Sequence, residues 1–308
     1  MKRPGIVVTT GDPCGCGPLV ALTALQKGGF NADEIFLVGS ETVLRRYPAY
    51  KTIKNKVTVV DLPFAGIDKL SPRPSLLGGK AALAYLDYAL NLMDRTGITR
   101  LVTAPVSKEA IQMVLPGFQG HTEYLAAKYG VKHVEMMMVS SQIKTVLFTR
   151  HIPFAAVSKA IKAPDLRRTI DLVLKTLRRS FKIVNPRIAL LSVNPHASEH
   201  TFLGPEEKNI LEAARSFKKN VDGPLASDTA FIPANLKKYD CFICMYHDQG
   251  MVPFKLLAFK DGVNFTAGLP IIRTSPAHGT AFDLMRTKTM PDCTSMHAAI
   301  KLALQLNP

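Results

Sequence analysis

The chain of 308 residues has no tryptophan and only five cysteines. An odd number of cysteines in a chain of this length argues against a disulfide framework. Cys241 and Cys244 have the spacing of a zinc knuckle, but Phe242 and Ile243 separate them without a glycine. Residues three apart on a strand point to opposite faces, so we interpret both thiols as apolar packing groups.

Long apolar runs are also missing, since no segment approaches the ~20 residues that a membrane-spanning helix needs. The basic start, MKRPGIVVTTGDP, is followed by an apolar segment too short for a signal peptide. We therefore predict no membrane partner and a cytoplasmic location. A content of 47% hydrophobic and 20% charged residues is ordinary for a globular protein, and the length favours two lobes.

Acidic residues are scarce relative to basic ones, 24 against 39, which leaves a formal net charge of +15. A positive charge of this size attracts anions such as phosphate esters and nucleotides. The lysines and arginines are scattered, and no stripe of them is interleaved with aromatic residues. Because a nucleic-acid site should be clustered, we predict no nucleic-acid partner and favour a small phosphorylated substrate.

Short apolar runs alternate with segments of helical periodicity along most of the chain. The runs predict strands at residues 5–10, 34–39, 57–60, 101–104, 188–193 and 241–246, and a pair around a turn at 136–140 and 145–149. Helices are predicted at 19–27, 79–93, 164–179, 206–217 and 296–306, and residues 61–78 are interpreted as a loop. This alternation predicts an α/β fold with a mostly parallel sheet. Polar residues follow the strands, where ligands bind in such sheets.

The stretch from residue 240 to 283 concentrates residue types that perform chemistry. An apolar run is followed by His247 and Asp248, and we expect a turn at Gly250. Lys255, Asn264 and Arg273 come next among apolar neighbours. Two cations and an amide suit a phosphate or a carboxylate, which the guanidinium can bind through two hydrogen bonds. The alternative is that these are ordinary surface residues.

Two other places carry weaker signals. His121 and Thr122 precede a helix, whose amides could help to hold an anion, although Thr122 could equally be a simple helix cap. The loop at residues 11–18, GDPCGCGP, follows a strand and opens a helix like a phosphate-binding turn. The glycine spacing of a dinucleotide fingerprint is absent, however, and Asp12 there could bind substrate or make an Asx turn.

Three histidines share one context, because His151, His196 and His247 each follow a predicted strand. Three imidazoles can form a divalent-metal site with open positions for a substrate. Their sequence separations match no local ligand motif, so the alternative is three polar histidines at the starts of loops.

Many segments together resemble the 4-hydroxythreonine-4-phosphate dehydrogenase family of vitamin B6 biosynthesis. They are TTGDPCGCGP, TAPVSK, GHTEYLA, TRHIPFAAV, VNPHASE, GPLASDTAF, YHDQGMVPFK, GVNFTAGLPIIRTS and HGTAFD. The resemblance implies an isocitrate/isopropylmalate dehydrogenase-like fold, with two α/β/α lobes around a cleft. We expect the first lobe at residues 1–118 plus 275–308 and the second at 119–274.

The resemblance also implies site residues and cofactors. It makes His151, His196 and His247 ligands of a divalent metal (Zn, Mg or Co), in an active site shared across a homodimer. The substrate contacts that it implies are His121, Thr122, Lys255, Asn264 and Arg273. It implies NAD or NADP without a dinucleotide fingerprint, and it identifies no cofactor-binding residue.

The implied reaction is oxidation of 4-phosphooxy-L-threonine at its C3 hydroxyl, followed by decarboxylation to 3-amino-2-oxopropyl phosphate in pyridoxal 5′-phosphate biosynthesis. Asp248, Asp228 and Lys255 are all candidates for the general base. The chain departs from the usual family motifs at Cys14, Cys16, Leu19 and Ala277.

Three alternative functions stay open. A paralogous dehydrogenase would act on 4-phospho-D-threonate or 4-phosphoerythronate. A metal-dependent phosphate-ester hydrolase would release phosphate without a nicotinamide. A non-catalytic anion-binding protein would tolerate loss of the three histidines.

Overall fold

A computed structural model describes residues 5–30, 32, 34–197 and 204–308 of the chain. No helix within those ranges is both long and apolar enough to cross a membrane. The strands are β1 Ile6–Thr9, β2 Ile35–Gly39, β3 Thr58–Asp61, β4 Arg100–Thr103, β5 Glu135–Val139, β6 Lys144–Leu147, β7 Ile188–Leu191, β8 Val221–Leu225, β9 Cys241–Cys244, β10 Val263–Ala267 and β11 Ile272–Pro276.

The helices include two short 3-10 segments, labelled η. They are α1 Gly17–Lys27, α2 Glu41–Leu44, α3 Pro48–Ile53, η1 Ile67–Lys69, α4 Leu76–Thr96, α5 Lys108–Gln112, α6 His121–Lys128, η2 Phe154–Ala156, α7 Val157–Ala160, α8 Ala163–Arg179, α9 Glu206–Arg215, α10 Ser227–Ala230, α11 Pro233–Lys238, α12 His247–Ala258, α13 Phe282–Arg286 and α14 Thr294–Gln305.

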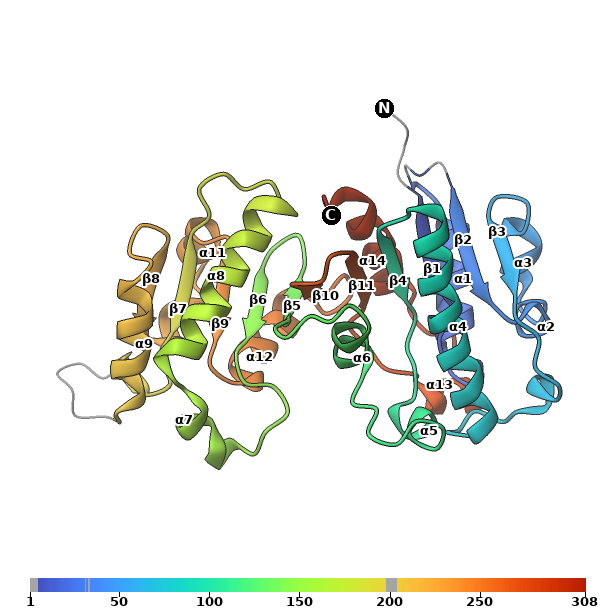
Figure 1. The fold of residues 1–308 in the computed structure, drawn as a ribbon, viewed down its shortest axis with the longest axis horizontal. Coiled ribbons are helices and arrows are strands. Elements are labelled where there is room, and N and C mark those ends of the chain that lie inside the picture. The colour runs from blue at the N-terminus through green and yellow to red at the C-terminus, as the bar shows by residue number, and fades with distance from the viewer. Residues whose placement is uncertain (1–4, 31, 33, 198–203) are drawn as a thin grey trace.

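Within the described residues, one sheet of 11 strands extends across both halves of the molecule in the order β3-β2-β1-β4-β11-β10-β5-β6-β9-β7-β8 (Figure 1). The outer strands on both sides pair in parallel, as predicted. The centre is antiparallel, because β10 pairs with both β11 and β5, and β5 pairs with β6 in the predicted hairpin. Parallel strands need long crossovers, and the helices supply them.

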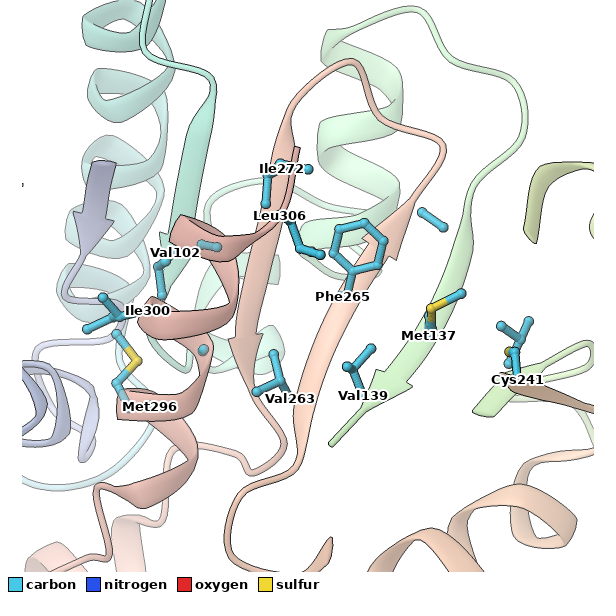
Figure 2. Close-up of a cluster of buried hydrophobic side chains, with 14 of the residues drawn as sticks. Val102, Met137, Val139, Cys241, Val263, Phe265, Ile272, Met296, Ile300 and Leu306 are labelled. Carbon is cyan, nitrogen blue, oxygen red and sulfur yellow. The ribbon is translucent and has the colours of Figure 1, made fainter. Parts of the chain in front are cut away.

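Helices cover both faces of the sheet, which confirms the α/β/α layering. Helices α1, α8, α9 and α14 pack against one face, and α4 and α12 against the other. In the central part of the core, α14 lies over β4, β10 and β11, with Met296 and Ile300 facing Val102 (Figure 2). Cys241 and Cys244 are buried in different clusters on the two sides of β9, as their spacing predicted.

Local sequence signals explain where several helices begin and end. Helix α4 begins where the Ser75 hydroxyl accepts a hydrogen bond from the Gly78 amide at 3.0 Å. It ends at Gly97, whose φ of 71° suits a glycine cap. Ser107 caps α5 in the same way through the Ala110 amide at 3.1 Å. The loop predicted at residues 61–78 is partly wrong, since it contains η1 and the first turn of α4.

The expected turn at Gly250 is wrong, because Gly250 lies inside α12. A Cβ atom there would meet the Leu147 Cδ2 atom at 2.6 Å and the Cys244 Sγ atom at 2.9 Å. The glycine therefore allows α12 to lie close to β6 and β9 rather than breaking the chain. Strands β8, β10 and β11 were not predicted.

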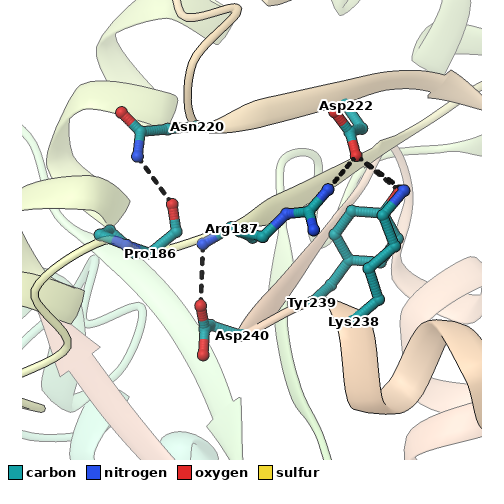
Figure 3. Close-up of polar contacts among 7 residues, drawn as sticks. All are labelled: Pro186, Arg187, Asn220, Asp222, Lys238, Tyr239 and Asp240. Carbon is teal, nitrogen blue, oxygen red and sulfur yellow. Dashed lines mark hydrogen bonds and ion pairs between the residues drawn. The ribbon is translucent and has the colours of Figure 1, made fainter.

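A polar network ties together the starts of β7, β8 and β9 at one end of the sheet (Figure 3). Asp222 accepts hydrogen bonds from Arg187 at 3.0 Å, Lys238 at 3.0 Å and Tyr239 at 2.9 Å. Burial alone would raise the pKa of Asp222, but these donors outweigh it and lower the pKa. Because the carboxylate is partly exposed, we assign this network a minor share of the stability.

The division into two lobes stays a prediction. Helices cluster around β1–β4 in one half of Figure 1 and around β6–β9 in the other. The sheet is continuous between them, and the expected boundary between residues 274 and 275 falls inside β11.

Candidate active site

A cavity of about 220 Å³ opens near the middle of the sheet. Its walls come from the segment after β4, the start of α6, the segment after β6, and strands β10 and β11 with the residues that follow them. Polar residues that follow separate strands therefore gather in one place, as the sequence predicted.

Arg273 is the most deeply placed cation of this cavity, with only 3% of its surface exposed. Its guanidinium donates to the Thr103 hydroxyl at 2.6 and 3.2 Å and to the Thr266 hydroxyl at 3.2 Å. Burial lowers its pKa to about 10, so the side chain remains charged at neutral pH. No carboxylate forms an ion pair with it among the described residues. A buried cation with only hydroxyl partners is suited to an anionic ligand.

His121 and Thr122 form the first turn of α6 and line the same cavity, as expected. The cap position is Gly120, and no side chain caps the helix. The alternative prediction, that Thr122 is a simple helix cap, is therefore wrong. Burial and then the charges of Arg273 and Lys108 hold the pKa of His121 well below its ordinary value. His121 is therefore neutral, and the helix presents uncapped amides beside a cation.

Asn264, also predicted, lies on β10 and lines the cavity. Its side-chain oxygen is buried and accepts no hydrogen bond from any described residue. His278 was not assigned a role from the sequence. Its Nδ1 atom lies 3.0 Å from the Gly279 carbonyl, which implies that Nδ1 donates and Nε2 is an acceptor. That Nε2 atom is buried without a partner in the described part of the chain.

Sequence reasoning also missed Lys108, Glu123 and Arg150 as cavity residues. Each lies in a segment that carried the family resemblance, namely TAPVSK, GHTEYLA or TRHIPFAAV. Lys108 and Arg150 are separated from Arg273 by over a hundred residues of sequence, so only the strand order brings them to one cavity.

Two of the three predicted metal ligands lie together. The rings of His151 and His247 have centroids 6.0 Å apart. His247 bonds through Nδ1 to the Asp248 carboxylate at 2.7 Å, which leaves Nε2 for a ligand. Burial, followed by the charges of Lys108, His247 and Arg150, lowers the pKa of His151. The neutral imidazole that a metal requires is thereby favoured.

His196 does not join them in this chain. It is exposed after β7 with a left-handed backbone, φ 56°. Within residues 5–30, 32, 34–197 and 204–308, no group of three or more His, Cys, Asp or Glu side chains is close enough to hold a metal. The metal site therefore stays a prediction.

The three candidates for the general base all lie outside this cavity. Asp228 is exposed on α10, and Asp248 is occupied with His247. Lys255 lines a neighbouring cavity of about 320 Å³ and donates to the Ala277 carbonyl at 2.9 Å. Burial lowers the pKa of Lys255. His278 borders both cavities, so Lys255 is close to the first without lining it.

The glycine loop at residues 11–18 is closed. A Cβ atom at Gly11 would meet the Pro105 carbonyl oxygen at 2.3 Å, and one at Gly17 would meet the Thr10 oxygen at 2.3 Å. Its glycines thus serve close backbone packing rather than a phosphate cradle. Burial raises the pKa of Cys14 to about 11 and of Cys16 to about 12, which makes both thiols unreactive.

The chain is similar to known proteins along almost its whole length. The family described as pyridoxal phosphate biosynthetic protein PdxA matches residues 29–303. The chain belongs to the PdxA family. A 4-hydroxythreonine-4-phosphate dehydrogenase of Desulforapulum autotrophicum is 38% identical over 98% of this chain and 95% of its own length. A D-threonate 4-phosphate dehydrogenase of Salmonella typhimurium is 34% identical over 99% and 100%, respectively.

Solved structures place the PdxA chain in the same fold. It superposes on a 4-hydroxythreonine-4-phosphate dehydrogenase from Klebsiella pneumoniae with a TM-score of 0.86, 32% identity and coverage of 99% and 98% of the two chains. A β-decarboxylating dehydrogenase from Thermococcus kodakarensis, 12% identical, shares the fold with a TM-score of 0.50 over 98% of this chain and 81% of that one. The predicted fold class and the assignment to a dehydrogenase family are confirmed.

Proposed function

We propose that this PdxA chain oxidises 4-phosphooxy-L-threonine at C3 and that the product loses carbon dioxide to give 3-amino-2-oxopropyl phosphate. Family membership supports this. The observation that carries it is one cavity lined by the first turn of α6, by His151 and by a buried Arg273 that has no carboxylate partner among the described residues. The role in pyridoxal phosphate biosynthesis supports a cytoplasmic location.

The chain's own residues bind and orient the substrate in this proposal. Arg273, Asn264 and the first turn of α6 hold the phosphate, remote from the carbon that is oxidised, so that binding energy there positions the reacting centre. Asp248 positions the ring of His247. Lys255, with its pKa lowered by burial, remains the candidate for proton transfer.

His151 and His247 fit a divalent metal, since the rings are adjacent and one is backed by a carboxylate. A bound metal and a nicotinamide would supply Lewis-acid stabilisation of the substrate oxygen and a hydride acceptor, respectively. Because His196 does not lie beside these two histidines within one chain, we propose that His196 of a second copy of the chain completes the ligand set. The closed loop at residues 11–18 does not fit a pyrophosphate, and we assign no residue to NAD or NADP.

We further propose that the site is completed in a homodimer. Helix α12 begins at His247 and exposes 65% of Val252 and 85% of Leu256, and Phe259 at its C-cap is 74% exposed. These residues are spaced four and three apart and therefore share one helical face. An apolar stripe of this kind is suited to a second copy of the chain, which would then lie beside His247 and Lys255.

The substrate decides between the close alternatives. The relative from Salmonella typhimurium gives 4-phospho-D-threonate specific support as a second candidate. Purified protein is assayed with 4-phosphooxy-L-threonine, 4-phospho-D-threonate and 4-phosphoerythronate, following NADH or NADPH formation and phosphate release separately. We expect the highest kcat/KM with 4-phosphooxy-L-threonine. Phosphate release without nicotinamide reduction would reject the dehydrogenase in favour of a hydrolase.

A further inference from the structure

Arg150 is a second cation of the cavity with no assigned role. It lies three residues beyond the end of β6 and lines the cavity half-buried. Its Nη1 atom is fully buried and has no hydrogen-bond partner within the described ranges. It also forms no ion pair there. A guanidinium held in this way lacks the partner that a structural arginine has.

The charges around Arg150 do not neutralise it. Lys108 adds positive charge to the same cavity, and Glu123 is the one acidic side chain among the described lining residues. Glu123 acts on Arg273, whose pKa it raises against the effect of burial. Arg150 itself forms no ion pair within the described ranges, so its wall of the cavity carries an unpaired positive charge.

The sheet keeps Arg150 apart from Arg273. Arg273 lies on β11 and Arg150 follows β6, with β10 and β5 between these strands. Three strand spacings correspond to roughly 14 Å between the two backbones. The Arg273 guanidinium is fixed on its own side by Thr103 and Thr266. The two arginines thus approach the cavity from different walls and meet different parts of a ligand.

We propose that Arg150 binds the carboxylate of the substrate while Arg273 binds its phosphate, so that the cavity selects short acids with an anion at each end. The inference rests on the proposed function for the substrate class. We assign the phosphate to the other wall because that wall offers more hydrogen-bond donors, namely Arg273 and the uncapped amides of α6. Arg150 is then left to bind the carboxylate. A planar guanidinium matches a carboxylate through two parallel hydrogen bonds.

The test compares two inert ligands that differ only in the carboxylate. Calorimetry gives Kd for 4-phosphooxybutanoate and for butyl phosphate with the full-length protein and with R150M and R150K. We expect R150M to raise the Kd of 4-phosphooxybutanoate roughly 10- to 100-fold, which is the usual effect of losing a charge-assisted hydrogen-bonded pair. The Kd of butyl phosphate should change less than about 3-fold, since Arg150 does not bind the phosphate in this proposal. R150K should lie between R150M and the parent for the first ligand.

The matched control is R273M, which should weaken both ligands equally because both carry phosphate. Equal loss of both ligands in R150M, or no loss of either, would overturn the assignment of Arg150. R150K also guards against misfolding in R150M, since it retains charge and volume. The measurement needs no turnover, so a failed assay with 4-phosphooxy-L-threonine would refute the proposed function and leave the carboxylate contact to be judged separately.

Discussion

Replacing Arg273 with methionine should remove function while leaving the fold almost unchanged. Deleting a large buried side chain usually costs ~2–5 kcal/mol of stability. Arg273 is different because no carboxylate forms an ion pair with its buried charge among the described residues, and the attraction of Glu123 does not offset the cost of burial. A pKa lowered from 12.5 to about 10 corresponds to roughly 3 kcal/mol of unfavourable charge burial, which methionine does not carry.

Lost hydrogen bonds partly offset the stability that R273M gains by removing the buried charge. The guanidinium bonds two hydroxyls, those of Thr103 and Thr266, and losing them costs about 1 kcal/mol each. The free energy of unfolding of R273M should therefore lie within about 2 kcal/mol of the parent, a shift of a few degrees in Tm. Losing two charge-assisted hydrogen bonds to phosphate should remove about 2–4 kcal/mol of transition-state stabilisation, which lowers kcat/KM roughly 30- to 700-fold.

Thermal unfolding with and without inorganic phosphate measures both effects. Phosphate at 100 times its Kd should stabilise the parent by about 2.7 kcal/mol and should not stabilise R273M. The control is R100M, because Arg100 donates to the carbonyls of Ala303 at 3.1 Å and Leu306 at 3.2 Å and lies outside the cavity. R100M should lower Tm and leave KM unchanged. A strongly destabilised R273M that keeps its phosphate response would refute the reasoning.

Three further outcomes are expected. H247A should lose bound metal and turnover with an unchanged circular-dichroism spectrum. D248N should weaken metal binding about 10- to 100-fold, because the His247 ring loses the carboxylate that orients it. Equal metal content in H247A and the parent would reject His247 as a metal ligand. The pKa of His121 is lower when folded than when unfolded, so the unfolded state gains the proton first and stability should fall as pH drops below about 6.5. Denaturant titrations of H121Q should show a flatter pH profile, and an identical profile would contradict a buried neutral imidazole. L256D should shift the protein to monomers in light scattering and reduce turnover, whereas a parent that is itself monomeric would exclude the dimer.

The strands and their polar ends were predictable because each is a local pattern. Strands β10 and β11 were not predicted, because the other strands were recognised from continuous apolar runs. Strand β10 mixes polar and apolar residues, and β11 contains three polar residues in a row, Arg273, Thr274 and Ser275. Asn264 and Arg273 nevertheless line one cavity. Their residue types suggested a shared ligand without knowledge of the strands, and that shared role stays a prediction. The turn predicted at Gly250 was wrong for the opposite reason. A glycine is needed there because the backbone lies close to Cys244 and to Leu147, which is distant in sequence.

The candidate site shows the same limit. His121, Thr122, Asn264 and Arg273 line one cavity as the resemblance implied. Lys255 lines the neighbouring cavity instead, where its amine donates to the Ala277 carbonyl. Which of two neighbouring cavities a lysine enters depends on side-chain packing, and no spacing in the sequence encodes that.

The unbroken hydrogen bonding through β10 also constrains how the enzyme can move. Its neighbours on both edges belong to opposite halves of the molecule, so the halves cannot swing on a flexible linker. Any narrowing of the gap between the wall of Arg150 and the wall of Arg273 must come from extra coiling of the central strands. The backbone distance between Arg150 and Arg273 should then change little, so under the proposed assignment the cavity should favour acids of one length.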